Sequence, residues 1–382
     1  MIKTEYYKDL TKMNTFGMKV KARCFIEYDS VADLVDIEFE ELARPVLHIG
    51  GGSNLLFTDD IKGTVLHSKI DFIEILDECH SAPVAPSQTS LGPSPYPGVG
   101  KCHFRTNDTS SGEVQPVETV LVSVGAGVVF DDFCDWAAKE GLWGVENLSH
   151  IPGEVGASAV QNIGAYGVEV KDVIRKVYCY DTVDEEFVNF DVEDLQYGYR
   201  DSAFKDPEIR GRYIVTHVVF ALSRTPQPKL EYGHLKEAVE AAGSELTPGL
   251  IRKVIIKIRN EKLPEPSVMG SAGSFFKNPV ISREHFERIE AAAKAEHGAD
   301  CKVPHYDLPD GMVKVPAAWM IEQCGWKGRR SGGAAVWEKQ PLVIVNYTGE
   351  AYPEEIIGLE KRIIASVKTK FGVELHPEVD HI

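Results

Sequence analysis

Residues 147–167 read NLSHIPGEVGASAVQNIGAYG, a run with four glycines, three alanines and one formally charged side chain, Glu154. So little charge argues against a solvated linker, and a buried path must satisfy its backbone N–H and C=O groups. Glycine permits positive-φ turns and a close approach of the backbone to a ligand. The amides of Gln161 and Asn162 can donate and accept hydrogen bonds. We interpret the run as a loop that wraps a large cofactor, with a ligand-free turn between strands as the alternative.

A second glycine-rich segment, HIGGGSNLL at residues 48–56, follows the short apolar run Pro45–Leu47. Consecutive glycines after a strand expose successive backbone N–H groups, which form a nest for an anion such as a diphosphate. The segment lacks the G-x-G-x-x-G spacing of a Rossmann site, and no Gly-Lys-Ser/Thr closes it as in a Walker A loop. On its own, such a turn is weak support for a nucleotide site.

Together with NTFG at residues 14–17, these segments resemble the UDP-N-acetylenolpyruvoylglucosamine reductase family, flavoenzymes of bacterial wall-precursor synthesis. The segment LEYGHL around Tyr232 looks like the longer of the family's two types. The resemblance extends in one order across nearly the whole chain, through YRDSAFK (199–205), KLP (262–264), GSFFKNP (273–279) and LHPEV (375–379).

The resemblance implies an α+β fold. It consists of an FAD-binding domain of the vanillyl-alcohol-oxidase (PCMH) type, made of two subdomains, and a C-terminal α+β substrate-binding domain. The expected boundaries are 1–68 and 69–222 for the two FAD-binding subdomains and 223–382 for the substrate-binding domain, whose tail returns to the active site. Residues 81–118 are rich in Pro, Ser and Gly. We predict a mobile surface insertion there, with a recognition loop as the alternative.

The spacing of apolar residues predicts strands interleaved with helices, which is typical of an α+β protein. We expect helices over Val31–Leu42, Phe130–Glu140, Leu250–Lys262, Arg283–His297 and Pro353–Phe371, the last with a proline suited to the first helical position. We expect strands over Val46–Ile49, Thr64–His67, Asp71–Leu76, Thr119–Val124, Val173–Tyr180, Glu186–Phe190, Tyr213–Leu222 and Leu342–Asn346.

The chain has 382 residues, more than one typical domain, and a formal net charge of −17. That charge argues against a nucleic-acid surface, although a local site can still be basic. The seven cysteines show no CxxC pair or metal-ligand spacing, which indicates free thiols and no metal site. The sequence starts without an apolar leader and has no apolar run near ~18 residues. We expect a cytoplasmic monomer that binds neither membranes nor nucleic acid.

Three residues within the shared motifs are candidates for the chemistry. Ser274 lies between small residues and two aromatics, which expose a hydroxyl and exclude water, although a serine that caps a turn is the plainer alternative. Arg200 can hold a carboxylate bidentately, although an ion pair with a nearby acid would explain it equally well. Glu378 lies near the C-terminus, where acids are usually solvated. The resemblance implies that Ser274 donates a proton and that Arg200 and Glu378 lie beside it.

The resemblance also implies the ligands and their contacts. FAD and NADPH are the expected cofactors, and the expected substrate is the enolpyruvyl ether of a UDP-sugar. Substrate contacts are expected at Tyr232, Lys262, Asn278 and Gln323, with a buried tyrosine and ordinary surface polar residues as the alternatives. FAD contacts are expected at Gly50, Gly51, Gly52, Ser53, Asn54, Asn147, Ile151, Pro152, Gly153, Gly156, Ala157, Gln161, Asn162, Gly164, Ala165 and Tyr166.

Three positions depart from the family pattern. Ala159 stands where the family usually has Pro, and His376 and Asp380 stand where it commonly has Glu and Arg. The change at Asp380 removes a basic side chain from the tail, whereas the acid Glu378 is kept.

We therefore expect NADPH-dependent reduction of UDP-N-acetylglucosamine enolpyruvate to UDP-N-acetylmuramate through FAD. One alternative is a related flavin-dependent oxidoreductase with another substrate, which would not need GSFFKNP or the tail acid. The other is a non-catalytic sugar-nucleotide-binding protein, which would tolerate loss of the three chemical residues.

Overall fold

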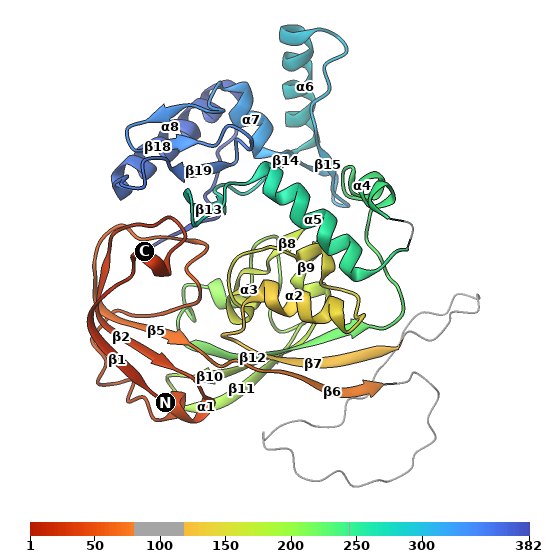
Figure 1. Ribbon diagram of the computed structural model, residues 1–382. Coiled ribbons are helices and arrows are strands. Elements are labelled where there is room, and N and C mark those ends of the chain that lie inside the picture. Colours follow the sequence, from red (N-terminus) through yellow and green to blue (C-terminus); the bar gives the residue numbers. More distant parts are fainter. Residues whose placement is uncertain (80–117, 244) are drawn as a thin grey trace.

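The computed structural model describes residues 1–79, 118–243 and 245–382. The described part contains a four-stranded sheet near the N-terminus, a five-stranded sheet in the middle and a C-terminal unit with smaller sheets. Figure 1 shows the C-terminal unit above the two larger sheets. The predicted insertion at 81–118 lies outside the described residues except for Glu118. No helix in the described ranges is long and apolar enough to cross a membrane.

The first sheet has the strand order β1-β2-β5-β3. Strand β2 pairs antiparallel with β1 and parallel with β5, which in turn pairs parallel with β3. Strand β3 directly precedes the glycine turn at residues 50–52. The elements are β1 (Lys3–Asp9), β2 (Lys21–Tyr28), α1 (Val31–Val35), β3 (Val46–Ile49), β4 (Leu55–Leu56) and β5 (Ile61–Ser68).

The second sheet, of order β11-β10-β12-β7-β6, is antiparallel throughout. Its strands are β6 (Ile73–Cys79), β7 (Thr119–Gly125), β10 (Ile174–Asp181), β11 (Glu186–Asp191) and β12 (Tyr213–Ser223). Helices α2 (Phe130–Lys139) and α3 (Val155–Gln161) cover one face (Figure 1), where they share one apolar core with the sheet. On the other face, Tyr180 and Ile214 pack with Ile26, Tyr28 and Leu66 of the first sheet. The two sheets therefore share a core as well.

Helices α4 (Leu235–Ala242) and α5 (Pro248–Lys262) follow the second sheet. Trp143, which precedes the glycine-rich run, packs with Leu235 and Ile251 of these helices. Arg252 of α5 forms an ion pair with Asp131 of α2. Both helices therefore pack against the second FAD-binding subdomain. We propose that the third domain starts after α5 rather than at residue 223.

The C-terminal unit combines a sheet of order β13-β19-β18-β17 with a three-stranded sheet of order β14-β16-β15. Helix α6 projects from this unit in Figure 1. The strands of the C-terminal unit are β13 (Gly270–Ser274), β14 (Val280–Ser282), β15 (Tyr306–Asp307), β16 (Met312–Lys314), β17 (Arg330–Ser331), β18 (Ala334–Val336), β19 (Val343–Asn346) and β20 (Asp380–His381). Its helices are α6 (Arg283–His297), α7 (Ala317–Gln323) and α8 (Pro353–Phe371).

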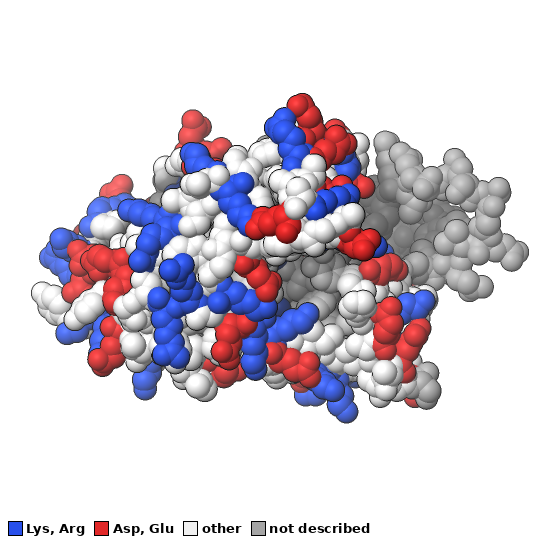
Figure 2. Space-filling view, turned by 90° about the horizontal axis from the view of Figure 1, so that it is seen from above, with Lys and Arg blue, Asp and Glu red and all other residues white. Residues whose placement is uncertain are grey.

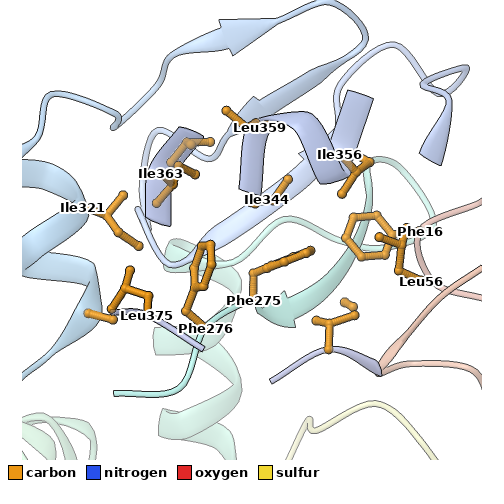
Figure 3. Close-up of a cluster of buried hydrophobic side chains, with 14 of the residues drawn as sticks. Phe16, Leu56, Phe275, Phe276, Ile321, Ile344, Ile356, Leu359, Ile363 and Leu375 are labelled. Atoms are coloured by element: carbon orange, nitrogen blue, oxygen red, sulfur yellow. The ribbon is translucent and has the colours of Figure 1, made fainter. Parts of the chain in front are cut away.

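The largest apolar core joins the C-terminal unit to the first sheet. Phe16 and Leu56 of the N-terminal part pack in one cluster with Phe275, Phe276 and the apolar face of α8 (Figure 3). The chain end also returns to the first unit, because β20 pairs in parallel with β4. The position of the C-terminal unit over the first sheet is therefore determined by shared burial and by a strand pair.

The structure confirms most predicted elements but corrects two of them. Helices α6 and α8 have the predicted bounds. The helix predicted over Val31–Leu42 is wrong beyond Val35, because Ile37 and Phe39 both enter the core between the two sheets. Residues two apart cannot share one helical face. Conversely, the run at 147–167 is not only loop, since it contains α3, whose small residues lie against β12 and β7.

Gly270→Ala tests the junction between β13 and the N-terminal part. A Cβ at Gly270 would lie 2.2 Å from the carbonyl oxygen of Phe16. We expect the free energy of unfolding to fall by about 1–3 kcal/mol, as for an overpacked core. The measurement is urea unfolding followed by circular dichroism.

The matched control is Gly358→Ala within α8, where, among the described residues, no atom outside the neighbouring helix backbone lies within 4 Å of the added Cβ. Because alanine is the better helix former, this variant should gain about 0.5–1 kcal/mol. Unchanged stability for Gly270→Ala would show that β13 can move away from Phe16 at no cost.

Candidate active site

A cavity of about 540 Å³ opens where the first sheet, α3 and the loop before β12 meet. The glycine turn at residues 50–52 forms one wall, and the small residues of α3 form another. Lys205 and Arg210 line the cavity from the loop before β12, and Asp380 lines it from the C-terminal tail. The walls thus consist largely of backbone and small side chains, with basic groups on one side.

The two glycine-rich segments meet at this cavity. Ser53 Oγ donates a hydrogen bond to the carbonyl of Pro152 at 3.0 Å. Gly153 has φ +120°, and a Cβ there would lie 2.8 Å from Ser53 Oγ. Gly52 has φ +61°, and a Cβ there would lie 2.0 Å from the carbonyl oxygen of Met13. Only glycine fits these two positions, so the sequence of both segments is determined by how closely the loops approach.

The groups around the cavity fit a flavin dinucleotide. Within the described ranges, the amide N–H groups of residues 50–52 have no backbone or side-chain acceptor, as expected of a nest for a diphosphate. Gln161 lines the cavity, and its buried Nε2 has no hydrogen-bond partner among the residues that the structure describes. A buried donor without a partner is costly, so a ligand that accepts from Gln161 would satisfy it.

The structure brings half of the predicted FAD contacts to the cavity. Of the others, Pro152 and Gly153 lie against Ser53, while Ile151 and Ala165 pack against the core around α2 and α3. The predicted residues that line the cavity are Gly50, Gly51, Gly52, Ser53, Asn54, Gly156, Ala157 and Gln161.

Two predicted FAD contacts use their side chains to hold other loops. Asn147 is buried, and its Nδ2 donates to the carbonyls of Tyr166 and Lys229 at 2.9 and 2.7 Å. Asn162 has φ +47° and ends α3 in the left-handed conformation. Its Nδ2 donates to the carbonyl of Gly198 at 2.7 Å, which secures the loop that carries Arg200.

Arg200 and Glu378 form a largely buried ion pair next to the cavity. Arg200 Nε lies 2.9 Å from Glu378 Oε1, with the two side chains 17% and 12% exposed. The guanidinium also donates to the carbonyls of Asn162 and Gly164. A Cβ at Gly164 would lie 2.8 Å from Arg200 Nη1, so glycine is required there to seat the arginine.

The backbone connects this ion pair to the cavity and to β13. Asn54 lines the cavity, and its Nδ2 donates to the carbonyl of Glu378 at 3.0 Å. Lys205 also lines it, and its Nζ donates to the carbonyl of Arg200 at 3.3 Å. The Glu378 N–H donates to the carbonyl of Phe275 at 2.8 Å. Ser274, the neighbour of Phe275, is exposed at the end of β13. Arg200, Glu378 and Ser274, the three residues predicted to carry the chemistry, therefore lie in one region of the structure.

The electrostatics of Glu378 are mixed. Burial raises the pKa of its carboxyl above the ordinary value, and the charge and hydrogen bond of Arg200 oppose that rise. Lys205 and Lys277 oppose it more weakly. The net rise means that Glu378 takes up a proton more readily than an exposed glutamate does.

An aromatic cluster lies beside Arg200. The rings of Tyr232 and Tyr306 are stacked at 6.3 Å, and Tyr166 meets Tyr232 edge-on at 5.9 Å. Lys314 Nζ lies 4.9 Å from the ring centroid of Tyr199 and 5.7 Å from that of Tyr306. The predicted substrate residue Asn278 joins the cluster, because its Nδ2 donates to Tyr199 Oη at 3.3 Å.

The other two predicted substrate residues lie apart from this cluster. Lys262 is exposed at the end of α5, and its carbonyl accepts from Trp337 Nε1. Gln323 ends α7 and lines a separate groove of about 280 Å³ between α6, α7 and α8. Among the described residues, no contact joins Gln323 to Arg200 or Glu378.

Sequence reasoning missed several residues of the site. Arg210, Tyr306 and Lys314 lie outside the quoted motifs, so no local pattern marked them. Glu154 carried a signal, since it is the only formal charge in its run. Figure 2 shows basic and acidic side chains interspersed on the face seen from above, so the site is not marked by a single charged patch on that face. Within the described ranges, no group of His, Cys, Asp and Glu side chains could hold a metal ion.

Two larger sheets meet at a glycine-lined cavity, and beside it Glu378 of the C-terminal unit pairs with Arg200 from the loop after β11. This arrangement is that of a flavin-dependent oxidoreductase. Residues 109–190 match the FAD binding domain family. Residues 265–382 match the family described as UDP-N-acetylenolpyruvoylglucosamine reductase, C-terminal domain. The predicted fold class, an FAD-binding domain with a separate C-terminal domain, is confirmed.

Full-length relatives agree with these domain matches. The chain is 46% identical over 374 residues to UDP-N-acetylenolpyruvoylglucosamine reductase of Bacteroides fragilis, covering 98% of each chain. It is 40% identical over 378 residues to the enzyme of that name from Porphyromonas gingivalis, covering 98% of this chain and 97% of the relative. The chain belongs to the UDP-N-acetylenolpyruvoylglucosamine reductase family. The crystal structure of the Thermus caldophilus enzyme shares the fold, with a TM-score of 0.59 at 21% identity over 100% of this chain and 98% of that one.

Glu378→Gln tests the electrostatics of the ion pair. Because the pKa of Glu378 is raised above 4.5, its contribution to stability is fully present below that pH and is lost as pH rises through the folded-state pKa. The variant does not titrate. The free energy of unfolding of Glu378→Gln relative to the wild type should therefore rise as pH increases above 4.5, measured by urea unfolding.

Glu374→Gln serves as the matched control nearby. A hydrogen bond from Lys368 lowers the pKa of Glu374, so the stabilising contribution of this carboxylate is lost as pH falls. The free energy of unfolding of Glu374→Gln relative to the wild type should therefore fall as pH rises. A Glu378→Gln difference that falls or stays flat as pH rises would contradict this account.

Proposed function

We infer that this protein reduces UDP-N-acetylglucosamine enolpyruvate to UDP-N-acetylmuramate, with FAD as cofactor and NADPH as reductant. The reaction belongs to peptidoglycan precursor synthesis. The observation that carries the inference is the convergence of the Arg200–Glu378 pair and Ser274 beside the glycine-lined cavity, in a chain of this family.

The cavity residues provide the binding and orientation of FAD. The N–H groups of residues 50–52 would hold its diphosphate, and Gln161 would donate to an acceptor on it. When bound, FAD supplies the hydride chemistry between NADPH and the enolpyruvyl double bond. The protein then has to place the substrate and manage the charge and the proton.

Arg200 and Glu378 are suited to the charge that develops on the substrate's carboxylate and the adjacent carbon. Arg200 is held by the carbonyls of Asn162 and Gly164, so its guanidinium is oriented before the substrate binds. Glu378 has a raised pKa because it is buried. A protonated Glu378 can donate a hydrogen bond to the developing negative charge in a site that excludes water.

Ser274 is proposed as the proton donor to carbon. Two observations support this role: Ser274 is exposed at the end of β13, and it directly precedes Phe275, whose carbonyl accepts from the Glu378 N–H. Phe275 and Phe276, the next two residues in the chain, are buried and would help to exclude water there.

The UDP-sugar is proposed to lie along the aromatic cluster. Tyr232 is 44% exposed, so its ring can change position when the ligand arrives. Asn278 would contact the substrate or hold Tyr199 in place, and Lys262 would contact it from the end of α5. Gln323 lines a different groove, so a contact between Gln323 and the substrate would require α7 to move. We also propose that the enzyme acts as a monomer in the cytoplasm.

The test of the activity is spectroscopic. The purified protein should be yellow from tightly bound FAD and should oxidise NADPH rapidly only when the enolpyruvyl UDP-sugar is added. The measurements are the visible spectrum and the loss of NADPH absorbance with and without the sugar. A colourless protein that binds no added FAD in a fluorescence titration would contradict the proposal.

Ser274→Ala tests the mechanism. Oxidation of NADPH by the enzyme should stay close to wild type, because no proton is delivered to carbon in that half of the reaction. Reoxidation of the reduced enzyme by the enolpyruvyl sugar should slow by roughly 10²–10⁴-fold, the contribution of a positioned general acid. Anaerobic stopped-flow absorbance measures the two halves separately.

Ser267→Ala is the matched control, since Ser267 is exposed just before β13 and, within the described part of the chain, its hydroxyl hydrogen-bonds only to Glu265. Both of its half-reactions should match the wild type. Equal slowing of both halves in Ser274→Ala would mean that Ser274 shapes the cavity, and no slowing would leave it a turn residue.

A further inference from the structure

Glu154 is the only formally charged residue between Asn147 and Gly167, and the structure gives it an unusual setting. It is the N-cap residue of α3, but its side chain makes no capping hydrogen bond. The residue is 8% exposed and lines the cavity. A buried carboxylate without partners is strongly unfavourable, so its contacts need an explanation.

One oxygen of Glu154 is held by a histidine from the first sheet. Glu154 Oε1 lies 3.0 Å from Nε2 of His67 on β5. The other ring nitrogen, Nδ1, lies 3.3 Å from Oε2 of Glu27 on β2. Lys3 Nζ of β1 lies 3.6 Å from Glu27 Oε1. Acidic and basic groups thus alternate from the surface at Lys3 to the cavity wall at Glu154.

The second oxygen of Glu154 is available to a ligand. Oε2 lies 3.1 Å from the position that a Cβ on Gly50 would occupy, so the carboxylate faces the bare side of the glycine turn. Among the described residues, no donor is paired with Oε2, and this atom is not sealed from solvent. Because Glu154 lines the cavity, a molecule in the cavity can reach Oε2.

His48, unlike His67, lines the cavity. His48 Nε2 lies 2.8 Å from the hydroxyl of Tyr28, and burial lowers the pKa of His48 to about 4. Burial opposes ionisation of Glu27 too, but the hydrogen bond and charge of His67 hold the pKa of the Glu27 carboxyl below its usual value. His48 is thus neutral near pH 7, whereas His67 lies between two carboxylates and contacts both of them.

We propose that Glu154 is a cofactor-recognition residue whose Oε2 accepts a hydrogen bond from a hydroxyl or ring N–H of FAD, with His67 and Glu27 as positioning residues. A carboxylate accepts hydrogen bonds from such neutral donors, whereas the N–H groups of residues 50–52 are suited to the diphosphate. The inference rests on the FAD cavity proposed above. Glu154 would thus bind a hydrogen-bond donor of the cofactor, whereas residues 50–52 would bind its diphosphate.

The test measures FAD affinity rather than turnover. The full-length protein is stripped of flavin, and FAD binding is followed by fluorescence quenching for the wild type and for Glu154→Gln. Replacing a charge-assisted hydrogen bond by a neutral one should weaken FAD binding by about tenfold. His67→Ala should weaken it by a similar factor, because Glu154 then lacks its partner.

A double variant separates positioning from a general structural effect. If His67 acts through Glu154, His67→Ala should weaken FAD binding in the wild type but add little in the Glu154→Gln background. The matched control is Glu146→Gln. Glu146 is 3% exposed, but its carboxylate accepts from the Gly144 N–H and does not line the cavity. That variant should bind FAD as the wild type does.

Fragments of the cofactor locate the donor. If the loss in Glu154→Gln appears with FAD and FMN but not with ADP, the donor belongs to the flavin half of the cofactor, and the reverse result assigns it to the adenosine half. Unchanged or tighter FAD binding by Glu154→Gln would overturn the inference. Should that variant fail to fold, Glu154→Asp, which cannot reach both partners, replaces it with the same expectation. A wild type that binds no FAD would instead refute the cavity assignment itself.

Discussion

The ion pair between Arg200 and Glu378 joins three parts of the chain at one point. Arg200 comes from the loop that follows β11 in the second sheet, and Glu378 comes from the tail of the C-terminal unit. The Glu378 backbone is held by Asn54 of the first unit and by Phe275. Since a buried charge left without its partner is strongly destabilising, neither loop can shift alone. The relative position of the three parts is therefore coupled to one electrostatic contact.

An apolar core shared by the C-terminal unit and the N-terminal part also holds these parts together. The core that contains Phe275, Phe276 and the face of α8 also contains Phe16 and Leu56 of the N-terminal part. The rings of Phe16 and Phe275 meet edge-on with centroids 6.1 Å apart. Because Ser274 immediately precedes Phe275, the packing that stabilises the fold also sets the distance between the proposed proton donor and the cavity. Stability and the geometry of the site thus depend on the same side chains.

The cavity itself depends on close backbone approach rather than on large side chains. Glycines at residues 52, 153 and 164 leave no room for a Cβ, and each lies against a different partner: Met13, Ser53 and Arg200. The departures from the family pattern are accommodated within this frame. Ala159 is buried in α3, and Asp380 lies 3.5 Å from Arg210, which brings a basic side chain to the cavity wall from the loop before β12.

The sequence by itself determined the long elements and the family, because the apolar spacing of α6 and α8 and the glycine-rich motifs are local patterns that need no partner to be recognised. It could not determine the end of α1, where Ile37 and Phe39 are drawn into a core between sheets, or the formation of α3 from small residues. Nor could it assemble Glu154, His67 and Glu27, or place Asn147 and Asn162 as loop anchors. Those contacts join residues far apart in the chain, and only the tertiary structure decides which buried polar groups find partners.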